Sequence, residues 1–278
     1  MSFIDYLNEA KAGKKYQPKT KDELIRLLTS GLELSDIDTS SLITSKSSKK
    51  KYQPKTSDEL KKLIKDETIY LGDIDTSKIK DMSYLFENIN RNDWSGIETW
   101  DVSNVTDMGY MFHDSNFNGD ISRWDVSKVK NMFGMFCGSQ FNGDISKWNV
   151  SSVENMSYMF MSAKFNGDIS KWNVSKVEEM DSMFRYSDFN KDISKWNVSN
   201  VRFMNDMFAE SKFNGDISKW HVYSAMAMNG MFQDSKFNKN ISKWKTFDRF
   251  VGTDDMFKNC PLENKYDYYP RFAIEPSD

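Results

Sequence analysis

Cysteine and histidine are scarce in this sequence. Its 278 residues include two cysteines, Cys137 and Cys260, and two histidines, His113 and His221. Two cysteines exclude a disulfide framework, and their separation along a stacked repeat would prevent a single bridge, so we expect reduced thiols. Neither histidine stands in a metal-ligand or nucleophile–base spacing, and no glycine-rich phosphate loop occurs. The sequence therefore predicts a protein that is not an enzyme and that needs no cofactor or metal.

Long apolar runs and charge of one sign are also lacking. No window approaches the roughly 18 apolar residues of a membrane span, and the opening MSFIDYLNEAKAGKK lacks the apolar region of a signal peptide. We therefore expect a cytoplasmic chain without membrane insertion. The 38 basic and 41 acidic residues leave a net charge of −3. A basic column is matched by an acidic one three residues earlier, which disfavours nucleic acid as a partner.

What the sequence does contain is a repeat of 24 residues. Tryptophan recurs at this step at Trp100, Trp124, Trp148, Trp172, Trp196, Trp220 and Trp244. Columns with the same step run from Ile97 to Ile241, from Met108 to Met228, from Phe112 to Phe232 and from Phe117 to Phe237. A period of this length is typical of supersecondary units that stack because none can bury its apolar face alone.

Each unit shows two internal periods. Phe141, Gly143 and Ile145 alternate with polar residues, which predicts a short strand. An apolar stripe and a Ser-x-x-Glu capping box then predict a helix of two to three turns, with the stripe at Val153, Met156, Met159 and Phe160 and the boxes at Ser151–Glu154 and Ser175–Glu178. Trp148 and Val150 share parity and are expected to turn the corner inward. The expected fold is an α/β repeat of strand-plus-short-helix coils.

The N-terminal region is duplicated. Residues 14–40 are a near copy of 50–77, and each copy has a Thr-x-x-Glu capping box, Thr20–Glu23 or Thr56–Glu59, before an amphipathic helix. The predicted parts are a first copy with a Ser/Lys linker at 1–49, a helical N-terminal cap at 50–86, repeats at 87–258 and an aromatic C-terminal cap at 259–278. The first copy is either an extra coil of the cap or a tethered module that docks elsewhere or on another protomer. We accordingly expect a monomer or a weak oligomer. At the other end, the core is expected to be sealed by Tyr266, Tyr268, Tyr269 and Phe272.

Several units together resemble a known family. ISRWDVSKVKNMFGMF, ISKWNVSSVENMSYMF and ISKWNVSKVEEMDSMF are similar to units of the BspA-like leucine-rich-repeat surface proteins, the mycoplasma lipoprotein-associated repeat type. The segment PKTSDELKKLI followed by GDIDTSKIKDMSYLF resembles the capping segment of such proteins. The resemblance covers about residues 51–257. It implies a right-handed leucine-rich-repeat-like solenoid used in adhesion or protein binding, with a cell-surface or secreted location as the alternative to the cytoplasm.

The outer positions of the predicted helix differ from coil to coil. Near-identical coils with one diversified face are typical of a recognition surface, although neutral drift at solvated positions would produce the same pattern. On the first interpretation the chain is a non-enzymatic scaffold that binds a protein through this face. The candidate partner-binding residues are Tyr110, Phe133, Tyr158, Arg202, Phe203 and Met226.

The outer face of the predicted strand is uniform instead. Its polar residues suit either pure structure or a repetitive ligand, so the alternative function is a surface adhesin or glycan-binding protein. The residues of this alternative face are Asn142, Asp144, Ser146, Asn166, Asp168 and Ser170. One carboxylate per coil is sparse for Ca²⁺, which takes six to eight oxygen ligands.

Overall fold

The structure is a computed structural model that describes residues 50–247 and 251–274. The chain divides into two units, Met1–Lys51 and Tyr52–Asp278, and the second contains nearly all of the described residues. The predicted first copy of the cap (1–49), with its Thr20–Glu23 pair and any oligomer contact it makes, lies outside the described residues.

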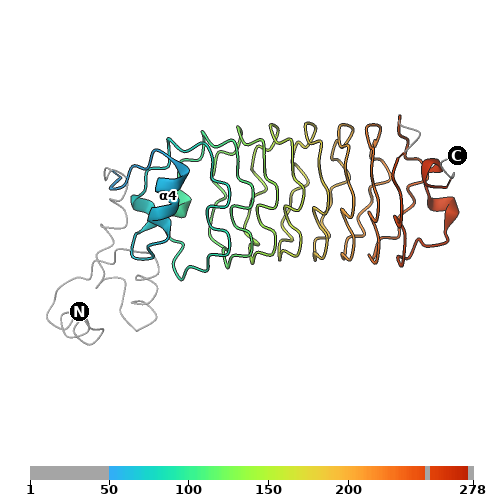
Figure 1. The fold of residues 1–278 in the computed structure, drawn as a ribbon. Coiled ribbons are helices and arrows are strands. Elements are labelled where there is room, and N and C mark those ends of the chain that lie inside the picture. The colour runs from blue at the N-terminus through green and yellow to red at the C-terminus, as the bar shows by residue number, and fades with distance from the viewer. Residues whose placement is uncertain (1–49, 248–250, 275–278) are drawn as a thin grey trace, which may run out of the picture. The chain divides into compact units, whose positions relative to one another are not determined.

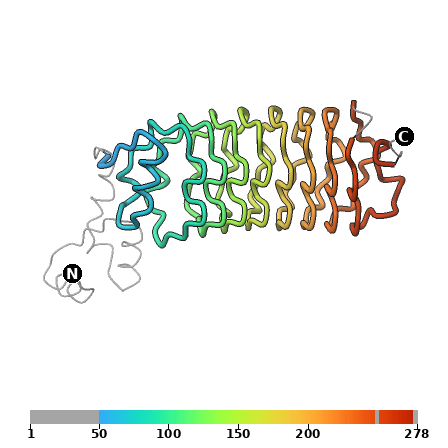
Figure 2. Tube along the Cα trace, viewed as in Figure 1, coloured from blue at the N-terminus to red at the C-terminus, as the bar shows by residue number. Residues whose placement is uncertain are grey.

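In the second unit, successive coils of the chain lie side by side in sequence order along one axis (Figures 1 and 2). Parallel bridges between single residues join each coil to the next through one column, at Asp81, Asp107, Asn131, Asn155, Glu179, Phe203, Ala227 and Gly252. A further bridge joins Tyr52 to Ile74. The rest of the described secondary structure is one α-helix, α4 (Ser57–Ile64), and the 3₁₀ helices η3 (Leu71–Asp73), η4 (Ile97–Thr99), η5 (Tyr266–Tyr268) and η6 (Arg271–Ala273).

The prediction of a short helix in each coil was wrong: in the described coils of the repeat, turns take its place. Where the sequence predicted it, the backbone N–H groups of Met156, Tyr158 and Phe160 donate to carbonyls of the next coil at 2.8–3.0 Å. An α-helix would direct the same groups four residues back. Tyr158 also has a φ of 61°, which interrupts a right-handed helix. The stripe at i, i+3, i+6 and i+7 faces inward in this series of turns as it would in a helix, so spacing alone did not distinguish them.

The predicted capping boxes inside the repeat fail for the same reason. The N–H of Glu154 donates to the carbonyl of Lys130 one coil earlier, at 2.8 Å, rather than to Ser151. Ser151 itself donates its N–H to Asn149 Oδ1 at 3.2 Å. Each of these serines belongs to a turn stabilised by the Asn or Asp two residues before it.

The predicted strand at Phe141–Ser146 is also absent. No bridge forms along it, and side chains link these segments between coils instead. The N–H of Asn166 donates to Asn142 Oδ1 at 2.9 Å, and Trp172 Nε1 donates to the carbonyl of Ile145 at 3.1 Å. The same two bonds recur in neighbouring coils. Hydrogen bonds from asparagine and tryptophan side chains therefore join these segments, in place of the backbone bonds of a sheet.

The predicted core columns are confirmed. The repeated Trp, Ile, Met and Phe side chains are all buried, and so are the corner residues Trp148 and Val150. Like side chains stack along the axis, with ring centroids 5.8 Å apart for Phe136–Phe160 and for Phe160–Phe184. Because each ring contacts its own copy in the adjacent coils, a 24-residue step is what keeps large rings in register.

The helix α4 closes the N-terminal end of the core. Thr56 Oγ1 accepts the N–H of Glu59 at 3.2 Å, which confirms the predicted helix start, and Glu59 Oε2 accepts the N–H of Lys55 at 2.7 Å. The apolar face of the helix buries Leu60 and Ile64. Arg91 is buried and donates to the carbonyl of Ile64, the last residue of α4, at 2.6 Å.

The C-terminal end is closed by only part of the predicted aromatic tail. Tyr269 is buried and stacks on Phe257 with ring centroids 3.9 Å apart, and Phe272 packs against the core. Tyr266 and Tyr268 are exposed, contrary to expectation. The backbone of this segment still contributes, since the N–H of Ile241 donates to the carbonyl of Tyr268 at 3.1 Å.

Candidate functional site

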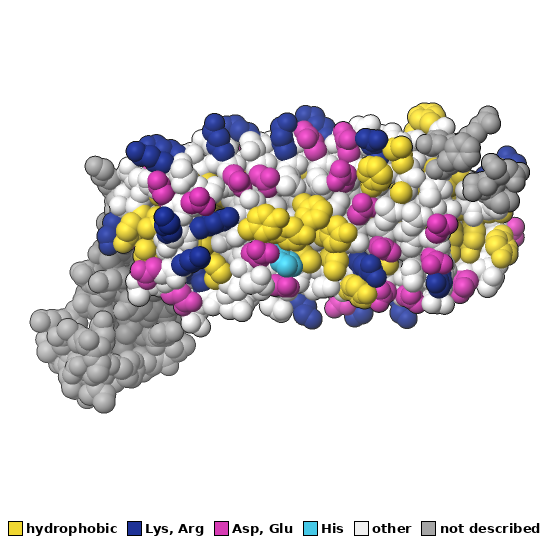
Figure 3. Space-filling model, viewed as in Figure 1, with side chains coloured by type: hydrophobic (Ala, Val, Ile, Leu, Met, Phe, Trp, Pro, Cys, Tyr) yellow, Lys and Arg dark blue, Asp and Glu magenta, His cyan; other side chains and the backbone are white. Residues whose placement is uncertain are grey.

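Four aromatic side chains from four successive coils form one contiguous row on the surface. This aromatic row consists of Tyr84, Tyr110, Phe133 and Tyr158, and neighbouring ring centroids lie 5.0–5.1 Å apart. Tyr84 is 48% exposed, and the other three are partly exposed. Figure 3 shows hydrophobic side chains gathered on the viewed face, with acidic and basic side chains around them. The row is therefore a surface feature built by the stacking of coils.

A glycine makes room for the row. Gly134 stands in the column of Tyr84, Tyr110 and Tyr158, has a φ of 57°, and lies so close to Tyr110 that an added Cβ would meet the ring at 2.5 Å. Tyr110 thus lies over the coil that lacks a tyrosine, and the preceding residue, Phe133, supplies the ring of that coil. Partial burial is the main cause that raises the pKa of the Tyr110 hydroxyl above its usual value.

Two carboxylates border the row. Glu87 Oε1 lies 3.3 Å from Nδ1 of His113, and Asp114 Oδ2 lies 3.3 Å from Nε2 of the same ring. The imidazole also contacts Tyr110 edge-on, with ring centroids 5.0 Å apart. We call Glu87 and Asp114 the acidic margin. Two carboxyl groups thus face a single imidazole at this edge of the row.

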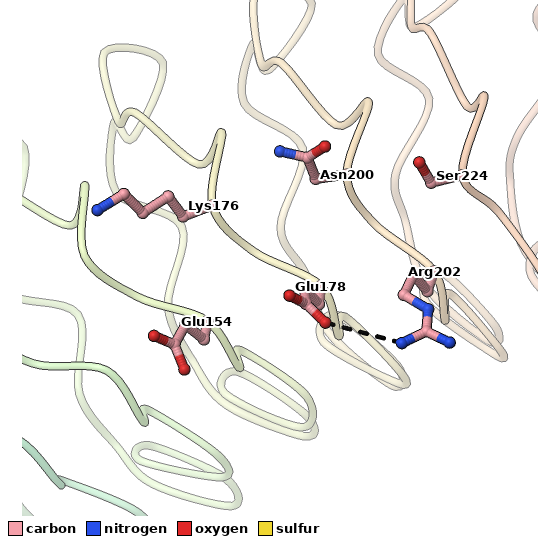
Figure 4. A pocket seen from close by; sticks show the side chains of 6 residues that line it. All are labelled: Glu154, Lys176, Glu178, Asn200, Arg202 and Ser224. Atoms are coloured by element: carbon pink, nitrogen blue, oxygen red, sulfur yellow. Dashed lines mark ion pairs between the residues drawn. The ribbon is translucent and has the colours of Figure 1, made fainter.

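The other three predicted partner-binding residues form a separate cluster. The Arg202 guanidinium lies 5.5 Å from the ring centroid of Phe203, and its Nη2 lies 3.3 Å from Sδ of Met226. Arg202 also lines a shallow groove of about 500 Å³ together with Glu154, Lys176, Glu178, Asn200 and Ser224. Figure 4 shows these side chains arising from successive coils, with Glu178 and Arg202 paired at 3.9 Å. The groove carries both signs of charge and no apolar anchor.

In the coils beyond Tyr158 the surface changes character. In the column that holds Phe133, later coils have Asp181, Asn205 and Asn229, and the N–H of each of the last two donates to the side-chain oxygen one coil earlier, at 2.7 and 2.9 Å. These side chains join successive coils. The aromatic row therefore ends where this polar ladder begins.

The uniform polar face has internal partners. Asn142 Oδ1 and Asn166 Oδ1 each accept the N–H of the asparagine in the next coil, at 2.9 and 3.1 Å. Asp144 Oδ1 and Asp168 Oδ1 each accept the N–H of the serine two residues on, Ser146 and Ser170, at 2.9 Å. One side-chain oxygen of each of these Asn and Asp residues is thus engaged in the scaffold.

The aspartate column gives the fold a predictable dependence on acid. The serine N–H is the largest influence on the pKa of Asp144 and of Asp168, and it lowers both from the usual 3.8. A carboxyl group whose pKa is lowered in the folded state stabilises the protein at pH values above its unfolded pKa of 3.8. This stabilisation is lost as the pH falls through the pKa of the folded state. We expect Asp144→Asn with Asp168→Asn to flatten the loss of thermal stability between pH 5 and about 2.5, measured by circular dichroism.

The column itself supplies the control for this substitution. Asn240 occupies the equivalent position, and its Oδ1 accepts the N–H of Ser242 at 3.0 Å, so asparagine fits the turn. An unchanged acid profile in the double variant would contradict the assignment of these two aspartates.

Sequence reasoning missed several exposed aromatic residues, among them Tyr84, Tyr186 and Phe247. Tyr84 extends the row and stands in the same column as Tyr110 and Tyr158, so aligning DMSYLF with the later coils would have found it. Tyr186 is 46% exposed and lies beneath the guanidinium of Arg185, whose Cζ is 4.8 Å from the ring centroid. Phe247 is 83% exposed and stacks on Tyr223, and it lies beyond the regular repeat, where no column pointed to it.

The chemically reactive side chains of the described region are enclosed or scattered. Both cysteines are free and buried, and burial raises the pKa of the Cys137 thiol to about 11. Within 50–247 and 251–274, no group of three or more His, Cys, Asp or Glu is arranged to hold a metal ion. No helix in the same residues has the length and apolar character to cross a membrane.

Comparison with known families identifies the repeat. Residues 58–166, 117–211 and 163–268 each match the model of the family described as Mycoplasma protein of unknown function, DUF285. Together the three matches cover well over half of the chain. No curated protein and no solved structure matches.

Proposed function

Because the chain belongs to the repeat family described as Mycoplasma protein of unknown function, DUF285, we propose a function from its own surface: a non-enzymatic scaffold that binds another protein. The carrying observation is the aromatic row, which brings Tyr84, Tyr110, Phe133 and Tyr158 together on coils that otherwise repeat. Partly exposed aromatic clusters supply most of the binding energy in many protein interfaces. We propose that the row is the primary contact and the Arg202–Phe203–Met226 cluster a secondary one.

The row suits a protein partner for two reasons. Each ring contacts the next ring of the row, with centroids 5.0–5.1 Å apart, so less side-chain entropy is lost when a partner covers them than for isolated side chains. Tyrosine also offers a polar hydroxyl beside an apolar ring, which suits an interface that is alternately exposed and covered. The uniform scaffold around the row would hold its spacing constant.

Substitutions at the two ends of the row test this function. We expect Tyr84→Ala with Tyr158→Ala to weaken binding of a captured native partner at least tenfold, which corresponds to about 1.4 kcal/mol. The partner would be captured on wild-type protein from an extract of the encoding organism, and its affinity measured by biolayer interferometry. Tyr186→Ala is the matched control, because Tyr186 is 46% exposed, close to the 48% of Tyr84, but lies outside the row. One face of its ring is already in contact with Arg185. Equal affinities for all three proteins would refute the proposal.

The fold class that best accommodates the stack is also a proposal. We infer a right-handed leucine-rich-repeat-like solenoid of the BspA-like type, supported by the 24-residue coils and the parallel bridges between them. This resemblance carries the alternative function, a surface adhesin or glycan-binding protein. Binding to a glycan array that Asn142→Ala and Asn166→Ala abolish would favour the alternative. Fractionation of native cells would decide between cytoplasmic and surface locations.

A further inference from the structure

Exposed aromatic rings in this protein fall into two groups according to whether they have a cation of their own. Arg185 lies over Tyr186 at 4.8 Å and Arg202 over Phe203 at 5.5 Å. Lys61 lies 6.0 Å from the ring of Tyr84, and Lys265 lies 6.0 Å from that of Tyr268. A cation within about 6 Å of a ring centroid is attracted by the negative charge of the ring face.

The three rings of the aromatic row beyond Tyr84 belong to the second group. Among the described residues, no basic side chain lies over Tyr110, Phe133 or Tyr158. The basic side chain of Lys130, in the same region of the repeat, is engaged with Glu154, with Nζ 3.2 Å from Oε1. These three rings therefore retain their attraction for a cation.

The charge beside these rings has the sign that would favour such a cation. Glu87 and Asp114 flank His113, and that imidazole contacts Tyr110. The side chain of Glu87 is 33% exposed and that of Asp114 is 53% exposed, so both carboxylates are accessible from solvent. A basic side chain on the row could thus pair with a carboxylate while its aliphatic part covers the rings.

The geometry of the row favours a flexible side chain over a flat sugar. The successive ring pairs are tilted by 27°, 66° and 44°, so the rings do not form one plane on which a polysaccharide could lie. Arginine suits tilted rings because its planar guanidinium stacks on a single ring and forms paired hydrogen bonds with a carboxylate. Lysine provides only a compact charge.

We propose that the aromatic row and the acidic margin bind an arginine-rich segment of the partner protein. The inference rests on the proposed function and specifies the chemistry of the partner. Three ring separations of 5.0–5.1 Å place the ends of the row about 15 Å apart at most. An extended segment of about five residues covers that length at ~3.3 Å per residue.

Fluorescence anisotropy with labelled hexa-arginine, hexa-lysine and hexa-glutamate peptides at 150 mM NaCl tests this inference on the full chain. We expect hexa-arginine to bind more tightly than hexa-lysine, and hexa-glutamate not to bind. Removing the charge of the margin with Glu87→Gln and Asp114→Asn should raise the Kd for hexa-arginine at least fivefold. Tyr110→Leu with Tyr158→Leu, which keeps apolar bulk but removes the rings, should do the same.

The control variant removes the same charge elsewhere. Asp192→Asn with Asp216→Asn eliminates two carboxylates of the turn column, where asparagine fits, and should leave the Kd unchanged. An equal loss of affinity in the control and margin variants would mean that only net charge is sensed, and would overturn the inference. Absence of hexa-arginine binding would also overturn it. In either case, the proposed function is tested separately. If Tyr84→Ala with Tyr158→Ala still weakens binding of the native partner, the row binds a protein but not through an arginine-rich segment.

Discussion

Replacement of Phe160 by alanine should lower the free energy of unfolding by about 3–5 kcal/mol. The side chain is fully buried and contacts the rings of Phe136, Phe165 and Phe184, with centroids 4.2–5.8 Å away. Its loss leaves a cavity between three coils that rigid neighbouring rings cannot fill. Because each coil is stabilised only by its neighbours, the damage should spread to both adjacent coils.

Urea unfolding followed by far-UV circular dichroism measures this loss, and hydrogen exchange locates it. Phe247→Ala is the matched control, since the same side chain is removed where it is 83% exposed, and its effect should be within about 0.5 kcal/mol. A loss below about 1 kcal/mol for Phe160→Ala would show that the stacked phenylalanine column does not bear the stability of the repeat.

Replacement of Arg91 by methionine should destabilise the protein by about 2–4 kcal/mol. The guanidinium donates to the carbonyls of Ile64, Ile69 and Asp93 at 2.6, 3.3 and 3.1 Å. The carbonyl of Ile64 belongs to the last turn of α4, where no partner within the helix is available. Methionine keeps much of the volume but leaves these carbonyls without their donor, so α4 should detach from the first coil more readily.

The Arg91 variant should show its largest effect in the cap. Hydrogen exchange of the amides in Ser57–Ile64 should accelerate more than exchange in the central coils. Arg123→Met, the same substitution at an exposed position of the basic column, should change stability by less than about 0.5 kcal/mol. Equal acceleration of hydrogen exchange in the cap and in the central coils would contradict the proposal that Arg91 holds α4 against the first coil.

The sequence predicted the inward side of each coil better than its backbone. Trp148, Val150 and Phe160 are buried as expected, because a side chain that stacks on its own copy has to be apolar in every coil. The expected strand and helix are absent because hydrogen bonds between coils compete with local ones. The N–H of Tyr158, for example, donates to the backbone carbonyl of Asp181 at 2.8 Å. Its hydrogen-bond partner is therefore a residue 23 positions away, which local sequence does not reveal.

The candidate site was predicted residue by residue but not as a unit. Tyr110, Phe133 and Tyr158 were selected because they vary, and the structure joins them with Tyr84. Arg202, Phe203 and Met226 were selected on the same grounds and form a second cluster. Variation along a column says which positions are free to differ, whereas contact depends on the tilt and reach of each side chain.

By itself the sequence determined the repeat length, the buried columns and the start of the cap helix at Thr56. Each of these depends on residue type at a constant spacing or within one helical turn, which is local information. Only the tertiary structure decided that asparagine and tryptophan side chains join the coils, and that the aromatic row lies beside an acidic margin. These features arise when residues about 24 positions apart come into contact, and their energies depend on the distances between side chains that the stacking of coils sets.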